Sequence, residues 1–230
     1  MIDPRLLQLG DSAFPSGAFS HSFGLETAIL ERGVRDADGV RAWIAAYLFR
    51  NVATLDARAI ALFIDGHVPV FELDDVLSAS LFAPDLRAAT RRLARATLDA
   101  YDAMGMTGSA MGVIASEINA YRAALDAGRA SGHHALACAL GYRAIGASAR
   151  DACCAYLSST AAALAAAAAR AVPLGQRDVG ALLWSLRPAI SAAADTAATA
   201  RTVDDLSASA FDCEIDAMRH TWLDGRLFAS

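Results

Sequence analysis

Apolar side chains recur at helical spacing along nearly the whole chain, and this periodicity limits the folds open to it. The clearest case is the segment 40–52, where apolar residues follow one another at intervals of mostly three or four: Val40, Trp43, Ile44, Tyr47, Leu48 and Val52. That spacing places them on one face of an α-helix. No segment shows the sustained alternation of a β-strand bounded by hairpin turns. The periodicity therefore predicts an all-α fold.

Glycine, proline and acidic turn residues divide the rest of the pattern into further helices. Asp36 or Asp38 can cap the helix that contains residues 40–52, and the other helices are expected over residues 21–33, 56–65, 73–82, 85–127, 133–147, 150–172, 175–201 and 209–222, with a break in 85–127 near its three central glycines. No linker rich in Gly, Ser or Pro separates them. We predict one compact domain, residues 1–230, of roughly eight to ten helices.

Composition excludes some classes of function. All 20 basic residues are arginine, so no lysine is present to form a Schiff base or a Walker-type phosphate site. The formal net charge of -5 is mild and the charges alternate in sign, which disfavours a nucleic-acid binder. The four cysteines lack CxxC spacing and fit reduced, buried thiols of a cytoplasmic protein, with zinc ligation as the alternative. No secretory signal pattern opens the chain.

Residues 156–172 are apolar enough to require a test for membrane insertion. Most of the segment is alanine, and it contains Ser158, Ser159, Thr160 and Arg170. Alanine is only weakly apolar, so a confident membrane span is not indicated. We expect a buried core helix that neighbouring helices can approach closely.

The segment 6–26, LLQLGDSAFPSGAFSHSFGLE, contains more aromatic residues than a loop usually holds. Its glycines, its proline and the Asp11-Ser12 pair specify the backbone path. Large side chains such as Phe14, Phe19 and Phe23 would be buried, so the segment is expected to be an ordered loop packed on the helices. Two interpretations remain open, an ordered lid over the core and a binding surface.

Metal binding and catalysis have weaker support. His133 and His134 are adjacent, so on a helix their side chains point about 100° apart and make a poor metal pair. His21 and His133 are weak metal candidates, because only tertiary contacts could bring further ligands to them. Serines flank His21, yet no nucleophile elbow or other activating arrangement surrounds them. A non-catalytic role is favoured.

The tail, residues 224–230, differs from an ordinary frayed end. It follows a flexible glycine with Arg226, Leu227 and Phe228, whereas frayed ends are normally small and polar. An arginine beside two large apolar groups suits docking into the groove of a partner. Docking back onto the core of the same chain is the alternative, and the sequence does not separate the two.

Four motifs in order give the chain a resemblance to the urease accessory protein UreF family. They are the segment 6–26, Gly132-His133 with Gly141-Tyr142, the residues VPLGQ at 172–176, and the residues RLFAS at 226–230. The chain departs from the family pattern at residues 207–211, which lack a proline, and after His220, where a threonine replaces a glutamate. Together the motifs span nearly the whole chain.

The resemblance implies a non-enzymatic, all-α protein that dimerises. Members of this family bind a UreD/UreH-type accessory protein, and that complex recruits a UreG-type GTPase, so that nickel is delivered into the urease apoprotein in a GTP-dependent step. No tightly bound cofactor is expected, since GTP belongs to a partner and nickel is in transit. A nickel-binding metallochaperone in its own right is the alternative function.

The resemblance also suggests which residues contact partners. The tail residues Arg226, Leu227, Phe228 and Ser230 are candidates for contact with the UreD/UreH-type partner. A shared partner or dimer surface would involve Asp11, Ser12, Phe14, Pro15, Gly17, His21 and Glu26 together with Pro173, Gly175 and Gln176.

Overall fold

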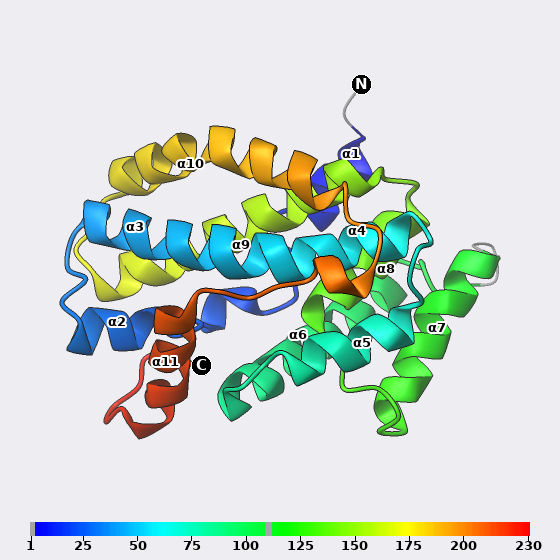
Figure 1. Cartoon of the computed structure of the whole chain (residues 1–230), viewed down its shortest axis with the longest axis horizontal. Coiled ribbons are helices and arrows are strands. Elements are labelled where there is room, and N and C mark those ends of the chain that lie inside the picture. Colours follow the sequence, from blue (N-terminus) through cyan, green and yellow to red (C-terminus); the bar gives the residue numbers. More distant parts are fainter. Residues whose placement is uncertain (1–2, 109–111) are drawn as a thin grey trace.

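The computed structural model describes residues 3–108 and 112–230, and it confirms the predicted all-α class (Figure 1). No strand occurs in these two ranges, and the helices pack as one compact domain. The α-helices are α1 (Pro4–Leu9), α2 (Leu25–Glu31), α3 (Ala37–Tyr47), α4 (Arg58–Ile64), α5 (Val70–Ala79), α6 (Pro84–Ala103), α7 (Val113–Asp126), α8 (His134–Ala144), α9 (Ala149–Ala171), α10 (Gln176–Ala197) and α11 (Phe211–Arg219). Short 3-10 helices are η1 (Ala18–Ser20), η4 (Val203–Asp205) and η5 (His220–Trp222).

Helix α9 lies at the centre of the fold and contacts most other helices. It packs along α10 and also touches α1, α2, α3, α4 and α8 (Figure 1). Length and composition alone would let α9 cross a membrane, but the side chains of Leu157 and Leu164 are fully buried in the helical core. Its many alanines let neighbouring backbones approach closely. The expected buried core helix is therefore what the structure shows.

One continuous rod replaces two helices that the sequence suggested as separate. The prediction of a distinct short helix over 56–65 is wrong, because a π-helical stretch, η2 (Leu48–Ala57), joins α3 to α4. No glycine or proline lies between Val52 and Asp56, so nothing interrupts the backbone. In a π-helix each backbone N–H bonds to the carbonyl five residues earlier, and both Asn51 and Asp56 of this stretch line the same cavity.

The N-terminal segment is more helical than the predicted loop. Residues 6–9 belong to α1, η1 forms a single turn, and α2 begins at Leu25 instead of near His21. Gly24 has a φ of 97°, and a Cβ there would lie 2.7 Å from the backbone nitrogen of Ala217, so this glycine permits α2 to approach α11 closely. The glycine break expected within 85–127 lies between α6 and α7, partly outside the described residues.

Helix α11 and the tail lie against α2 at one end of the molecule, opposite α7 (Figure 1). A small apolar cluster of Ala83, Leu86 and Ala217 joins this end to α6. Phe23 packs against both that cluster and the main core. All four cysteines are free thiols, and Cys154 is the least buried of them.

Candidate functional site: the docked tail and the neighbouring cavity

The tail folds back onto the segment that precedes α2. The backbone oxygen of Ser230 accepts hydrogen bonds from the backbone nitrogens of Ser22 (2.7 Å) and Phe23 (3.1 Å) and from the Ser22 hydroxyl (2.8 Å). The backbone nitrogen of Ala229 donates to the carbonyl of Ser20 at 3.0 Å. A short set of hydrogen bonds thus joins residues 229 and 230 to residues 20–23.

Glu26 anchors the middle of the tail. Its Oε1 accepts from the backbone nitrogen of Leu227 at 2.6 Å, and its Oε2 accepts from that of Phe228 at 3.2 Å. Oε2 also lies 2.9 Å from Nε2 of His220. Both Glu26 and His220 are buried, so these bonds form in a low-dielectric environment and replace the water that the carboxylate would otherwise bind.

His21 is the second polar anchor. Its Nδ1 lies 2.7 Å from the Ser230 hydroxyl, and the imidazole is buried. Burial, together with the neighbouring Arg92 and His220, lowers the pKa of His21 to about 4. At neutral pH the ring is therefore uncharged, which suits a hydrogen bond to a neutral hydroxyl.

The large side chains of the tail divide into one inward and one outward group. Phe228 is buried, and the guanidinium of Arg170 stacks on its ring at 4.4 Å from the centroid while also donating to the carbonyl of Phe19. Leu227 is 56% exposed, and Arg226 pairs with Asp85 at 3.3 Å. The tail thus docks on its own chain, which was one of the two interpretations of the sequence, while the side chain of Leu227 stays exposed.

Exposed apolar groups surround the docked tail. Phe19 and Trp222 are 60% and 79% exposed, so the expectation that Phe19 is buried is wrong. We call the exposed side chains of Phe19, Trp222, Arg226 and Leu227 the tail surface. Beside it, α11 exposes a row of apolar residues at helical spacing: Phe211, Ile215 and Met218. Exposed apolar patches often mark partner sites.

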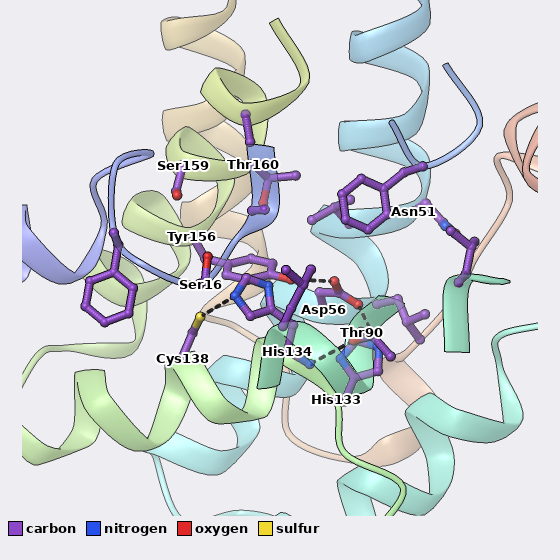
Figure 2. A pocket seen from close by; sticks show the side chains of 18 of the residues that line it. Ser16, Asn51, Asp56, Thr90, His133, His134, Cys138, Tyr156, Ser159 and Thr160 are labelled. Carbon is purple, nitrogen blue, oxygen red and sulfur yellow. Dashed lines mark hydrogen bonds and ion pairs between the residues drawn. The ribbon is translucent and has the colours of Figure 1, made fainter. Parts of the chain in front are cut away.

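A cavity lies behind the N-terminal segment (Figure 2). It leaves about 60 Å³ for the centres of water molecules. Residues 11–23 form one wall, and most of the other lining residues lie on η2, α6, α8 and α9. The polar residues among those that line it include Asp11, Ser16, Asn51, Asp56, Thr90, His133, His134, Tyr156, Ser159 and Thr160.

The polar groups of the cavity are arranged around Asp56. The Tyr156 hydroxyl donates to Oδ2 of Asp56 at 2.9 Å, and Nε2 of His133 lies 4.0 Å from its Oδ1 (Figure 2). Burial raises the pKa of Asp56, whereas His133 and Tyr156 oppose that rise. Across the cavity, Nε2 of His134 lies 3.4 Å from Sγ of Cys138, and burial lowers the pKa of His134 to about 3.

Two matches with known proteins extend this description. The family model for UreF matches residues 34–187. Urease accessory protein UreF of Paenarthrobacter aurescens (strain TC1) is 36% identical over 225 residues, which cover 98% of this chain and 96% of the relative. The chain belongs to the UreF family.

More distant members of the UreF family match over the same length. UreF of Bacillus sp. (strain TB-90) is 31% identical over 234 residues, and UreF of Corynebacterium glutamicum (strain R) is 30% identical over 236 residues. These alignments cover 98% and 99% of this chain. The match to the UreF family model covers residues 34–187, so it includes neither residues 20–26 nor residues 226–230, which form the tail contact. The alignments with full-length relatives extend over nearly all of the chain.

The structure brings some of the UreF-derived site residues together and leaves others apart. His21 and Glu26 meet Phe228 and Ser230 in the tail contact. Asp11, Ser12 and Pro15 are exposed, and the Asp11 carboxylate accepts a hydrogen bond from the backbone nitrogen of Ala13 at 2.8 Å. The ring of Phe14 lies 5.9 Å from that of Tyr101, measured between centroids. Gly17 takes a φ of 80° at the start of η1.

Pro173, Gly175 and Gln176 form the turn into α10. The backbone nitrogen of Gly175 donates to the Asp178 carboxylate at 2.9 Å, which caps the helix. Pro173 and Gln176 are exposed. Within the described ranges no hydrogen bond joins residues 173–176 to the tail. They belong to a separate surface near the C-terminal end of α9.

The weak metal candidates do not meet. His21 bonds to Ser230 whereas His133 faces Asp56, and no group of three or more His, Cys, Asp or Glu side chains is arranged to hold a metal within residues 3–108 and 112–230. Zinc ligation by the cysteines finds no such group there either.

Sequence reasoning missed Asp56, Tyr156, His220 and Asp74. Asp74 is buried and accepts from the Tyr121 hydroxyl at 2.6 Å and from the backbone nitrogens of Ser131, Gly132 and His133, so it fixes the turn before α8. The same helix contains the exposed acidic residues Glu72 and Asp75, so no local signal in the sequence singles out Asp74.

Proposed function

We propose that this chain is a non-catalytic cytoplasmic scaffold for urease maturation. In this proposal it binds a UreD/UreH-type accessory protein and a UreG-type GTPase, and the complex supports GTP-dependent nickel insertion into the urease apoprotein. The relatives are named only as urease accessory proteins, so the partners come from the family resemblance. Nickel is cargo here, and GTP is bound by the partner.

The observation that carries this proposal is the tail surface. Leu227 and Arg226 stand outward on a tail whose neighbours Phe228 and Ser230 are buried. A docked tail loses less conformational entropy on binding than a free one, so its exposed groups are prepared for a partner. Together with the apolar row on α11, the tail surface is our candidate contact for the UreD/UreH-type partner.

A second surface is our candidate for the GTPase or for a homodimer. It comprises the exposed parts of the N-terminal segment, at Asp11, Ser12 and Pro15, and the turn at Pro173 and Gln176. The UreD/UreH-type partner would bind at the tail surface and the GTPase at the second surface. If this complex binds the nickel-releasing state of the GTPase more tightly than its other states, complex formation favours that state. The scaffold supplies this coupling free energy and no covalent chemistry.

Co-purification with the three partners tests the proposal. We expect Leu227→Ala and Trp222→Ala to weaken capture of the UreD/UreH-type partner at least about tenfold, a loss of about 1.4 kcal/mol each, as for central apolar anchors. Leu7→Ala is the matched control, because Leu7 is 61% exposed on α1 and lies outside the tail surface. Deletion of residues 226–230 should abolish capture.

Two results would contradict this assignment. Equal capture by intact and truncated chains would remove the tail from the interface. Equal weakening by Leu7→Ala would show that the effect is nonspecific.

Two further measurements extend the test. Urease activation in cells, measured with the same variants, should fall in the same order. Light scattering of the purified chain should give the mass of a dimer.

A further inference from the structure

The tail and the cavity share one wall. Residues 11–23 line the cavity through Asp11, Phe14, Ser16, Ala18 and Phe23, and the end of this same segment carries the hydrogen bonds to residues 229 and 230. We call residues 11–23 the lid. A contact that holds the end of the lid therefore also holds the wall of the cavity.

Phe23 is the residue at which the two features meet. Its backbone nitrogen donates to Ser230, while its ring lines the cavity and stacks on Tyr47 with 6.1 Å between centroids. Its φ is 54°, the left-handed region that a bulky side chain rarely adopts. Such strain persists only where surrounding contacts impose it. The hydrogen bonds that the backbone nitrogens of Ser22 and Phe23 donate to the Ser230 backbone oxygen are such contacts.

The cavity floor is built to hold small polar molecules. Nε2 of His133 and Oδ1 of Asn51 have no hydrogen-bond partner among the described residues, and both side chains are at least nine-tenths buried. Nδ1 of His133 accepts from the backbone nitrogen of Ala135, so Nε2 carries the proton and donates. A small molecule that accepts a hydrogen bond from His133 and donates one to Asn51 would give these unpartnered polar atoms their partners.

We propose that small hydrogen-bonding molecules, water first among them, occupy this cavity, which we call the chamber. We also propose that the docked tail holds the lid closed over it, so that tail and lid together act as a gate. Release of the tail frees the backbone of residues 22 and 23, Phe23 leaves its strained conformation, and its ring withdraws from the cavity wall. The space of about 60 Å³ accommodates several water molecules, since each needs about 10–15 Å³ on this measure. The use of this gate by a partner rests on the proposed function, whereas the gate itself belongs to this chain.

Cys138 provides the readout, because its thiol lines the chamber. Cys153 is the internal control: it is fully buried and lies outside the chamber, donating to the carbonyl of Ala57. Mass spectrometry after timed exposure to a small neutral maleimide gives the modification rate of each thiol. Trypsin cleavage after Arg226 reports independently whether the tail has been released.

The variant Phe228→Asp releases the tail by placing a charge in a buried apolar site. We expect cleavage after Arg226 to accelerate and modification of Cys138 to rise at least about tenfold, with Cys153 unchanged, as local opening predicts. Leu30→Asp is the matched control, because Leu30 is 56% exposed on α2, and both rates should stay at the value of the unaltered chain.

An unchanged Cys138 rate in a chain whose tail is cleaved readily would overturn the proposal. If both thiols react faster in Phe228→Asp, the rates of Cys138 and Cys153 are compared again in the milder variant Phe228→Ala. A rise in both rates in that variant would also count against the gate. Because no partner is present in this experiment, its failure would leave the scaffold function standing, and a failed co-purification would leave the gate standing.

Discussion

Glu26 and His220 lie 2.9 Å apart in a buried contact although 194 residues separate them in the chain. The same carboxylate accepts from two backbone nitrogens of the tail. Glu26 therefore joins α2, η5 and the tail at a single point. Its position explains how a short C-terminal segment is held without a long helix of its own.

Loss of the Glu26 carboxylate should destabilise the fold strongly. Glu26→Ala leaves the His220 imidazole and two tail amides without their acceptor, and we expect the free energy of unfolding in urea to fall by about 3 kcal/mol. Glu31→Ala is the control on the same helix, because Glu31 pairs with Arg219 in a partly exposed contact at 3.2 Å and should cost less than about 1 kcal/mol. Similar losses for the two variants would contradict the anchoring role.

Stability should decrease as the solution is acidified below the ordinary pKa of histidine. Unfolded His21 takes up a proton near pH 6.5, whereas the folded state resists protonation until about pH 4. Protons therefore favour the unfolded chain within this window, by up to about 1.4 kcal/mol per pH unit for one such group. Urea unfolding at several pH values measures this slope.

His21→Gln should make that slope shallower, since glutamine can still bond to Ser230 and does not titrate. His134, whose pKa is lowered to about 3, keeps part of the slope. His67→Gln, at an exposed histidine, is the control for the substitution itself. A slope identical in His21→Gln and the unaltered chain would show that His21 is not the group responsible.

Gly141 should not tolerate a methyl group. A Cβ at this position would overlap the phenol group of Tyr101, which is itself fully buried and cannot move aside easily. We expect Gly141→Ala to lower stability by about 2 kcal/mol or more, the usual cost of overpacking. Gly180→Ala, on an exposed part of α10 with open space around it, should instead raise stability by about 0.5–1 kcal/mol. Thermal unfolding of both variants checks the pair.

Asp74 should matter far more than its neighbour Asp75. Asp74→Ala leaves the Tyr121 hydroxyl and three backbone amides of the turn before α8 without an acceptor, so stability should fall by more than about 2 kcal/mol. Asp75 is exposed, and Asp75→Ala should change stability by less than about 0.5 kcal/mol. Hydrogen exchange at Gly132 and His133 should accelerate only in the first variant.

Helical periodicity and turn residues were sufficient to predict most of the helices. Asp36 caps α3 by accepting from the backbone nitrogen of Gly39 at 2.8 Å, as expected, and α8, α9 and α10 begin and end within a few residues of their predicted bounds. These features are local, because each depends on side chains within one or two turns. The joined rod was missed, since a π-helical stretch arises from packing and carries no sequence signal of its own.

The candidate site was less accessible to sequence reasoning. His21 and Glu26 were selected from the family motif, but their partners His220 and Ser230 lie about 200 residues further along, so no local pattern links them. Phe19 was expected to be buried with the other phenylalanines. Its carbonyl bonds to Arg170 and its ring turns outward, and this orientation depends on a contact with a distant helix.

The π-helical stretch in the rod makes the cavity sensitive to insertions and deletions. Deleting one residue between Asn51 and Asp56 while the helical bonding pattern of this stretch stays as it is would turn everything that follows by about 100°. Asp56 would leave the chamber, and Ile60 and Phe63 of α4 would lose their places in the core. Length in this part of the chain is therefore under stricter constraint than residue identity, and natural variation here should proceed by substitution.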